Sequence, residues 1–190
     1  GSPLPKDAKV TWSLEKGSLR VDYQYLLDGD YDYAGVGLTY PEKGVTGATL
    51  RANGPYRVWK NRLKGPGFGV FYKEYNNTIT GQDWDYPEFK GYYSGFQAVK
   101  IHSDQTADMT VIVPDEGRYL QLFTPGKPVE PIDQCHPAFP DADISVLDII
   151  PAIGTKFSSA AEEGPQGERE HRKNMVVKGT VYIILDDWDI

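Results

Sequence analysis

Residues 9–27 read KVTWSLEKGSLRVDYQYLL, and this stretch decides the fold class. Residues 9–15 and 19–27 both alternate apolar with polar side chains, a period of two that is typical of β-strands with one buried face. Residues 16–18, Lys-Gly-Ser, separate the two runs and are short enough for a hairpin turn. The stretch therefore predicts an antiparallel β-hairpin whose second strand ends at residues 28–30, Asp-Gly-Asp.

The rest of the chain repeats this pattern of short strands and turns. Further strands are predicted at residues 33–40, 47–52, 67–75, 94–103, 108–113, 119–123, 144–153 and 174–186. No apolar stripe at helical spacing lasts for three turns, so we expect very little helix. Many short strands joined by turns predict an all-β fold, a large antiparallel β-sandwich.

Four segments interrupt the predicted strands. Residues 60–67 and 75–91 are long polar and aromatic connections, of the kind that compact domains keep when they bind something or pack as ordered excursions. Residues 125–143 form a Pro-rich connection with little capacity for ladder hydrogen bonds. Residues 160–173 are highly charged and poor in apolar side chains, so a mobile loop is predicted there.

The charge balance narrows the classes of partner. The chain carries 20 basic and 27 acidic side chains, a formal net charge of −7. A phosphate backbone would be repelled by such a surface on average, so nucleic acid is not expected as a partner. No stretch approaches the roughly 18 apolar residues of a membrane span, so no membrane partner is expected either. The binding of neutral sugars does not depend on the net charge.

The chain is interpreted as one domain. Residues 1–8 are assigned to a tag remnant and linker, because Gly1 and Ser2 are typical of cloning, and residues 9–190 to a single β-sandwich domain. Targeting is therefore not read from this terminus. The single Cys135 excludes an internal disulfide. Periplasmic, extracellular and cytoplasmic locations in a bacterium all stay open.

Several separated phrases point to a known family. Residues 54–62 read GPYRVWKNR and residues 86–92 read YPEFKGY. Phe139-Pro140, Asp143-Ile144-Ser145 and Ala152-Ile153-Gly154 follow later in the chain. These phrases and their order resemble the C-terminal domain of family 2 glycoside hydrolases of the β-galactosidase type, in its Bacteroidetes-like form. The resemblance extends from about residue 9 to the C-terminus.

This resemblance implies an architecture and a role. The domain would be a supersandwich of the galactose-mutarotase-like kind, which covers part of the mouth of a catalytic barrel and takes part in assembly. The chain alone would not be an enzyme, because the acid and the nucleophile of the family belong to the barrel. We therefore expect a non-catalytic domain that shapes the rim of the sugar site, the assembly interface, or both. The implied partners are the catalytic barrel of the parent enzyme and galactosides.

Carboxylates in the aromatic-rich segment are candidate catalytic groups. Glycoside hydrolysis needs two carboxyl groups beside the bond, and burial of Asp83, Asp85 or Glu88 would raise a carboxyl pKa. Acidic residues are mostly exposed or paired at surfaces, so solvated or bracing roles are favoured. No catalytic residue is assigned. We predict instead a structural brace in which Arg62 binds Glu88 through a bidentate hydrogen-bonded pair.

Aromatic side chains are the stronger functional candidates, because their faces suit the apolar C–H faces of pyranose rings. Trp84, with polar neighbours, is the best candidate for exposure, and Tyr86 lies two residues further on. For Trp59 and Tyr72, packing in the sandwich core or attachment of the two long loops to it is favoured. Two alternatives, exposure for stacking on sugars and packing in the core, stay open for Tyr56, Tyr75, Tyr92 and Tyr93. The alternative function is an independent carbohydrate-binding module that uses such exposed aromatics.

A loop near residue 155 is the third candidate. In the family that the chain resembles, a loop at about this place reaches toward the sugar site and presents an aromatic side chain. Residues 152–159 read AIGTKFSS, so this chain offers Lys156 and Phe157 there and lacks a Trp. Both are predicted to contact carbohydrate, with a flexible exposed loop as the alternative.

Metal and cofactor sites find no support in the sequence. His102, His136 and His171 lie far apart, and the group of Asp133, Cys135 and His136 lacks the spacings of zinc sites. The chain has no Gly-rich phosphate loop. We expect neither a metal nor a cofactor.

Overall fold

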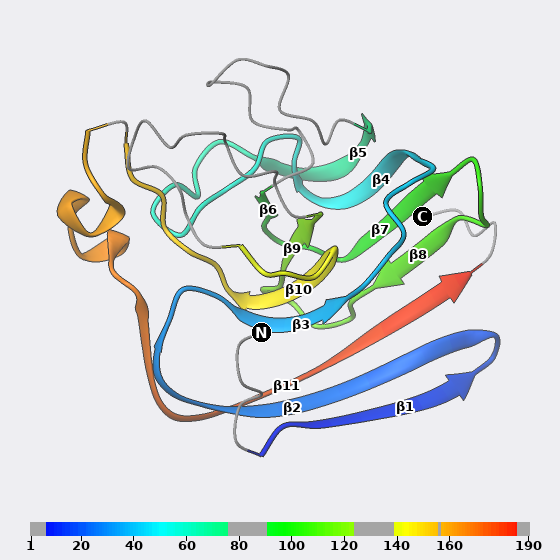
Figure 1. The fold of residues 1–190 in the computed structure, drawn as a ribbon, viewed down its shortest axis with the longest axis horizontal. Helices are drawn as coiled ribbons and strands as arrows, with labels where there is room; N and C mark the ends of the chain where they lie inside the picture. The colour runs from blue at the N-terminus through cyan, green and yellow to red at the C-terminus, as the bar shows by residue number, and fades with distance from the viewer. Residues whose placement is uncertain (1–6, 76–90, 124–138, 156, 186–190) are drawn as a thin grey trace.

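The computed structural model describes residues 7–75, 91–123, 139–155 and 157–185, and its strands form two antiparallel sheets (Figure 1). The larger sheet has seven strands in the order β1 (Lys9–Glu15), β2 (Ser18–Tyr31), β11 (Glu170–Leu185), β8 (Met109–Ile112), β7 (Ala98–Ser103), β4 (Val45–Gly54) and β5 (Gly67–Glu74). The smaller sheet has four, in the order β3 (Ala34–Leu38), β10 (Ile144–Ile149), β9 (Tyr119–Leu122) and β6 (Tyr92–Tyr93).

The predicted all-β sandwich is confirmed. Within the described ranges the helical elements are two short 3₁₀ turns, η1 (Ala160–Glu163) and η2 (Pro165–Gly167). The two-residue strand β6 was not predicted. No helix in the described part of the chain is long and apolar enough to cross a membrane.

The predicted hairpin forms around a two-residue turn. β1 pairs with β2 from Glu15 opposite Ser18 to Lys9 opposite Gln24. The turn residues Lys16 and Gly17 both have positive φ, 47° and 85°. Two positive φ values give a turn whose twist matches the right-handed twist of the strands it joins. The turn therefore sets the register of the hairpin.

Only one strand of this hairpin buries a face. Val21, Tyr23 and other alternate residues of β2 are buried, as predicted. The prediction is wrong for β1, where Val10, Trp12 and Leu14 are 49%, 54% and 80% exposed. β1 is the outermost strand of the larger sheet and lies to one side of the smaller sheet (Figure 1). Its apolar face therefore continues the core-facing side of the sheet beyond the core.

Two strands are longer than predicted because they pair with each other. β2 was expected to end at residues 28–30, but it continues to Tyr31 opposite Glu170. β11 correspondingly begins at Glu170, inside the segment 160–173 that was predicted as a loop, and that prediction is wrong for residues 170–173. A bulge between Arg172 and Met175 accommodates the extension. Hydrogen bonding to a partner strand here outweighs the low strand propensity of the residues.

The main core lies between the two sheets. The larger sheet contributes alternate residues of its central strands, and the smaller sheet contributes alternate residues of β9 and β10. Examples that are at most 2% exposed are Leu50, Ile101, Val111, Val181, Leu120, Leu122, Ile144 and Val146. Burial of such side chains stabilises the fold by about 1.5–3 kcal/mol each before chain entropy is subtracted.

A second, smaller apolar cluster lies on the other face of the smaller sheet. It contains Val58, Tyr92, Leu147 and Ile150, with Trp59, Tyr119 and Phe139 packed against it. Leu147 follows Val146 in β10 and points to the opposite face, as strand geometry requires. The smaller sheet is therefore covered on both faces, by the larger sheet on one and by the segment with Val58 and Trp59 on the other. This segment carries part of the candidate site.

Candidate functional site

The segment 55–62, which follows β4, is held against the outer face of the smaller sheet. The Val58 N–H donates to the Tyr92 carbonyl at 2.7 Å. The Trp59 ring packs edge-on to the rings of Tyr92 and Phe139, with centroids 5.3 and 5.7 Å apart. Tyr92 and Phe139 stack on each other at 5.6 Å. Edge-on and stacked ring pairs contribute stability beyond that of the area they bury. This aromatic cluster therefore holds the segment against the smaller sheet.

Asn61 joins this segment to the loop after β10. Its Nδ2 donates to the Ile153 carbonyl at 2.8 Å, and its Oδ1 accepts from the Ile153 N–H at 3.0 Å. The Lys60 N–H adds a hydrogen bond to the Pro151 carbonyl at 2.9 Å. A side-chain amide carries one acceptor and two donors and so can pair with a backbone as a strand would. The phrases at residues 54–62 and 152–154 are thus bound to each other.

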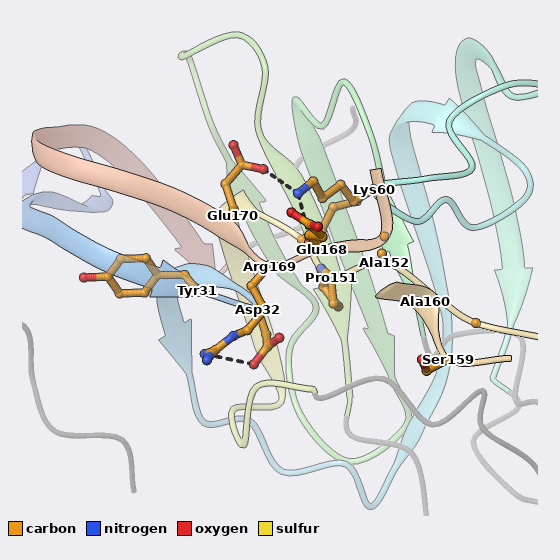
Figure 2. Close-up of a pocket in the computed structure, with 13 residues that line it drawn as sticks. Tyr31, Asp32, Lys60, Pro151, Ala152, Ser159, Ala160, Glu168, Arg169 and Glu170 are labelled. Carbon is orange, nitrogen blue, oxygen red and sulfur yellow. Dashed lines mark hydrogen bonds and ion pairs between the residues drawn. The ribbon is translucent and has the colours of Figure 1, made fainter. Parts of the chain in front are cut away.

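A cleft of about 250 Å³ lies beside this junction (Figure 2). Its walls come from the end of β2, from Lys60, from residues 150–152, 154, 159 and 160, and from the start of β11 with the residues just before it. The lining residues are Tyr31, Asp32, Lys60, Ile150, Pro151, Ala152, Gly154, Ser159, Ala160, Gly167, Glu168, Arg169 and Glu170. The unexpected extension of β2 and β11 therefore builds one wall of the cleft.

Four of the five charged side chains that line the cleft form two ion pairs. Lys60 Nζ lies 2.7 Å from Glu170 Oε2 and donates to the Glu168 carbonyl at 2.9 Å. Arg169 pairs with Asp32 at 3.2 Å. Figure 2 shows the two ion pairs, in which the neighbouring residues Arg169 and Glu170 reach Asp32 and Lys60. The lining holds two cations, Lys60 and Arg169, and three carboxylates, Asp32, Glu168 and Glu170, so the cleft presents both donors and acceptors with an excess of one carboxylate.

Glu170 is ionised at neutral pH. The hydrogen bond from Lys60 is the largest cause that holds the pKa of Glu170 below its ordinary value. Partial burial opposes this shift, and a hydrogen bond from Arg172 adds to it. A general acid of a glycosidase needs a raised pKa, so Glu170 suits an ion pair and not proton donation.

Phe157 projects from a turn that borders the cleft. The Thr155 N–H donates to the Ser158 carbonyl at 2.8 Å, and the Thr155 hydroxyl accepts from the Ser158 N–H at 3.1 Å. It also accepts from the Phe157 N–H at 3.3 Å. The Phe157 residue is 85% exposed. A large aromatic group is thus displayed on a hydrogen-bonded turn.

The predicted site residues are only partly described. Trp84, Tyr86, Glu88 and Lys156 lie outside the described residues, so their predicted roles stay predictions. Arg62 donates to the Gly154 carbonyl at 3.3 Å and lies 3.5 Å from Glu163 Oε2. It therefore contacts the same loop as Asn61, and the pair with Glu88 stays a prediction.

The aromatic residues divide between core and surface. Tyr92 and Tyr93 are at most 2% exposed and fill the two apolar clusters. The core position predicted for Trp59 fits its place in the aromatic cluster. The core position predicted for Tyr72 is wrong, because Tyr72 is 59% exposed on the outer face of the edge strand β5.

A polar relay on the larger sheet was missed in the sequence. His102 Nδ1 lies 2.8 Å from Asp108 Oδ2, and its Nε2 lies 2.8 Å from Thr49 Oγ1. Burial is the largest single effect on the pKa of Asp108 and by itself would raise it. Hydrogen bonds from His102 and the Ser103 N–H, together with the charges of His102 and Lys100, outweigh burial and lower this pKa. His102 and Asp108 are close in the sequence, whereas Thr49 is brought next to His102 only by the register between β4 and β7.

The order carboxylate, imidazole and hydroxyl in this relay is the order that activates a nucleophile in acyl-transfer enzymes. Such enzymes also need free N–H groups that stabilise an oxyanion. Thr49 lies in β4 between β5 and β7, and the ladders to these two strands take up the N–H groups of β4. We therefore interpret the relay as a network that orients side chains.

In the described part of the chain, no three His, Cys, Asp or Glu side chains are grouped to hold a metal ion. Comparison with known proteins adds no assignment, because no protein-family model and no curated protein matches the chain.

Proposed function

We propose that this chain is a non-catalytic C-terminal domain of a β-galactosidase-like glycoside hydrolase, and that the end of the sandwich around Phe157 forms part of the rim of the sugar site. The catalytic barrel of the parent enzyme is the proposed partner, and galactosides are the proposed substrates of the whole enzyme. The role in carbohydrate metabolism is one of shaping and support, and the bond-breaking groups belong to the barrel.

The observation that carries the proposal is the convergence of the resembling phrases at one place. Residues 54–62, Tyr92, Phe139 and residues 152–154 are spread along the chain, yet they meet in the aromatic cluster and the Asn61 junction. A loop that displays an aromatic group at a rim needs a rigid base. The Asn61 and Arg62 contacts hold Ile153 and Gly154, the two residues that come just before the turn that carries Phe157.

The chemistry of the adjoining cleft is compatible with a sugar. A pyranose is neutral and offers many hydroxyl groups, which hydrogen-bond to charged side chains without altering their pairing. The balanced ion pairs of Lys60 with Glu170 and of Arg169 with Asp32 provide such partners. The exposed ring of Phe157 provides an apolar surface for the C–H face of the same ligand.

The edge strand β1 supports the assembly part of the proposal. Val10, Trp12 and Leu14 share the side of the larger sheet that continues the core. Rows of exposed apolar side chains beside a core mark contact surfaces in many soluble proteins. In the proposed parent enzyme this row would pack against a neighbouring domain.

The experiment that tests the rim is kinetic. Phe157→Ala in the full-length gene product is expected to raise KM for a chromogenic galactoside several-fold with a smaller change in kcat, because it removes a binding surface and no reacting group. Phe157→Tyr keeps the ring and should keep KM within about twofold of wild type. Thr106→Ala, at an exposed turn residue, is the matched control. An unchanged KM in Phe157→Ala would contradict the rim role.

A further inference from the structure

The outer face of β5 presents a row of exposed apolar side chains that the proposed function does not use. Phe68, Val70 and Tyr72 are 55%, 57% and 59% exposed. They alternate along the strand and so point to one side of the sheet. Phe68 and Tyr72 are four residues apart, roughly 13 Å along the strand. Two aromatic groups are therefore displayed at a defined spacing on a rigid element.

A polar row runs beside the apolar one. Asn53, Arg51 and Thr49 of β4 lie directly opposite Phe68, Val70 and Tyr72 in the ladder. Residues directly opposite in an antiparallel pair have their side chains on the same face, about 5 Å apart. We call these six residues the β5 face. Each apolar group on this face thus has a hydrogen-bonding group as its nearest lateral neighbour.

The relay described above orients the Tyr72 end of the β5 face. The Tyr72 ring lies 5.9 Å from the His102 ring, measured between centroids. His102 Nδ1 lies 2.8 Å from Asp108 Oδ2 and its Nε2 lies 2.8 Å from Thr49 Oγ1, so the ring is held between these two groups. A hydroxyl carries one donor and two acceptor sites, so Thr49 Oγ1 keeps an acceptor site for a ligand besides its contact with His102.

We infer that the β5 face binds an oligosaccharide chain, independently of the cleft near Phe157. Rings at Phe68 and Tyr72 would stack on two sugar rings of one chain, and Arg51, Asn53 and Thr49 would hydrogen-bond its hydroxyl groups. Sheet faces with aromatic side chains bind both oligosaccharides and oligonucleotides in other folds. The net charge of −7 disfavours the nucleic acid.

The size of the β5 face also separates a sugar chain from a protein partner. Stable protein interfaces use about 20–30 residues on each side, whereas the apolar row has three side chains on a single edge strand. A sugar chain needs only a few stacked rings with hydrogen bonds between them. The dimensions and the alternation of aromatic with polar groups therefore fit a linear glycan.

Native affinity electrophoresis of the isolated chain in gels that contain β-1,4-galactan or mixed-linkage β-glucan tests this inference. Wild type is expected to be retarded by at least one polysaccharide. Tyr72→Ala and Phe68→Ala should each weaken the apparent affinity about tenfold. Tyr72→Phe, which keeps the ring, should stay within about threefold of wild type. Trp12→Ala, a similarly exposed aromatic at the opposite edge of the same sheet, should migrate as wild type.

Three results would overturn the inference. One is the absence of retardation in both gels, and another is equal weakening by Trp12→Ala and Tyr72→Ala. The third is a dimer in sedimentation velocity that Tyr72→Ala dissociates, which would assign the β5 face to a second copy of the chain. Thermal melting of each variant shows that it is folded. None of these results depends on galactoside turnover, so failure here is distinguishable from failure of the proposed function.

Discussion

At the scale of single residues, side-chain hydrogen bonds bring together segments that are remote in sequence. Asn61 and Ile153 are 92 positions apart and exchange two hydrogen bonds. Neither residue stands out in composition or periodicity. The resemblance placed both phrases in one family, but their contact follows only from the course of the chain over the smaller sheet.

We predict that Asn61→Ala lowers the free energy of unfolding by about 1–3 kcal/mol, because it leaves the Ile153 carbonyl and N–H without their partner. Asn61→Asp should be similarly unfavourable, since a carboxylate keeps the acceptor but faces the Ile153 carbonyl. Urea denaturation provides the measurement. Thr106→Ala, at an exposed turn residue, is the control and should be neutral. An Asn61→Ala variant with an unchanged free energy of unfolding would show that the Asn61 junction does not stabilise the loop.

The Lys60–Glu170 pair gives a pH dependence of known sign. The folded pKa of Glu170 is depressed, chiefly by Lys60. A depressed carboxyl pKa stabilises the fold above the unfolded value of about 4.3, and this contribution is lost as the pH falls through the folded pKa. Lys60→Met is therefore expected to melt below wild type at neutral pH, with a gap that narrows below about pH 4.

Melting curves between pH 3 and pH 7 check this expectation. Lys43→Met removes the same charge at an exposed position and should give a smaller gap. A Lys60→Met gap that stays constant across the series would assign the loss to packing of the lysine stem and not to the ion pair.

At the scale of elements, the strand assignments show what period and turn chemistry can predict. The bounds of β1 were predicted correctly, and the other predicted strands occur within a few residues of their places. β6 was missed because two residues carry no period, and its strand character comes from pairing with β9. The lengths of β2 and β11 were underestimated because pairing partners are invisible in a local pattern.

The pairing of β2 with β11 depends on a glycine. A Cβ at Gly179 would lie 2.3 Å from Tyr23 Oη and 2.4 Å from its Cζ. Tyr23 is opposite Gly179 in the ladder and only 3% exposed, so its ring covers the glycine and has little room to move. We predict that Gly179→Ala lowers the free energy of unfolding by about 1–3 kcal/mol through overpacking.

Thermal or urea unfolding measures this loss. Gly67→Ala is the matched control within the same sheet, because no atom lies within 4 Å of its added Cβ. If both substitutions were neutral, the Tyr23 ring would have to leave its place over the glycine without penalty.

The candidate site was predictable in part. Arg62 and Phe157 were both named from the sequence, and the structure places Arg62 against the Gly154 carbonyl and leaves Phe157 exposed. Their predicted roles, a brace to Glu88 and a contact with carbohydrate, stay predictions. The cleft wall of Lys60 and Glu170 was missed, since Glu170 fell in a charged segment that was expected to be a loop. Charge-rich composition indicates disorder only when no partner strand is at hand.

At the scale of the whole molecule, the larger sheet extends past the smaller one and carries apolar rows on both of its edge strands. On β1 the row continues the core side, whereas on β5 it lies on the outer face. The two edges therefore present different surfaces, and we propose a neighbouring domain as the partner of the β1 row and a glycan chain as the ligand of the β5 face. The cleft and the Phe157 turn lie at a third place.

The central claim is that this domain supports sugar hydrolysis without carrying it out. The most direct measurement is turnover of a chromogenic galactoside by the isolated chain and by the full-length gene product at equal concentration. The account predicts hydrolysis by the full-length protein and none above the buffer rate by the isolated chain. Turnover by the isolated chain, or a full-length protein without glycosidase activity, would contradict it.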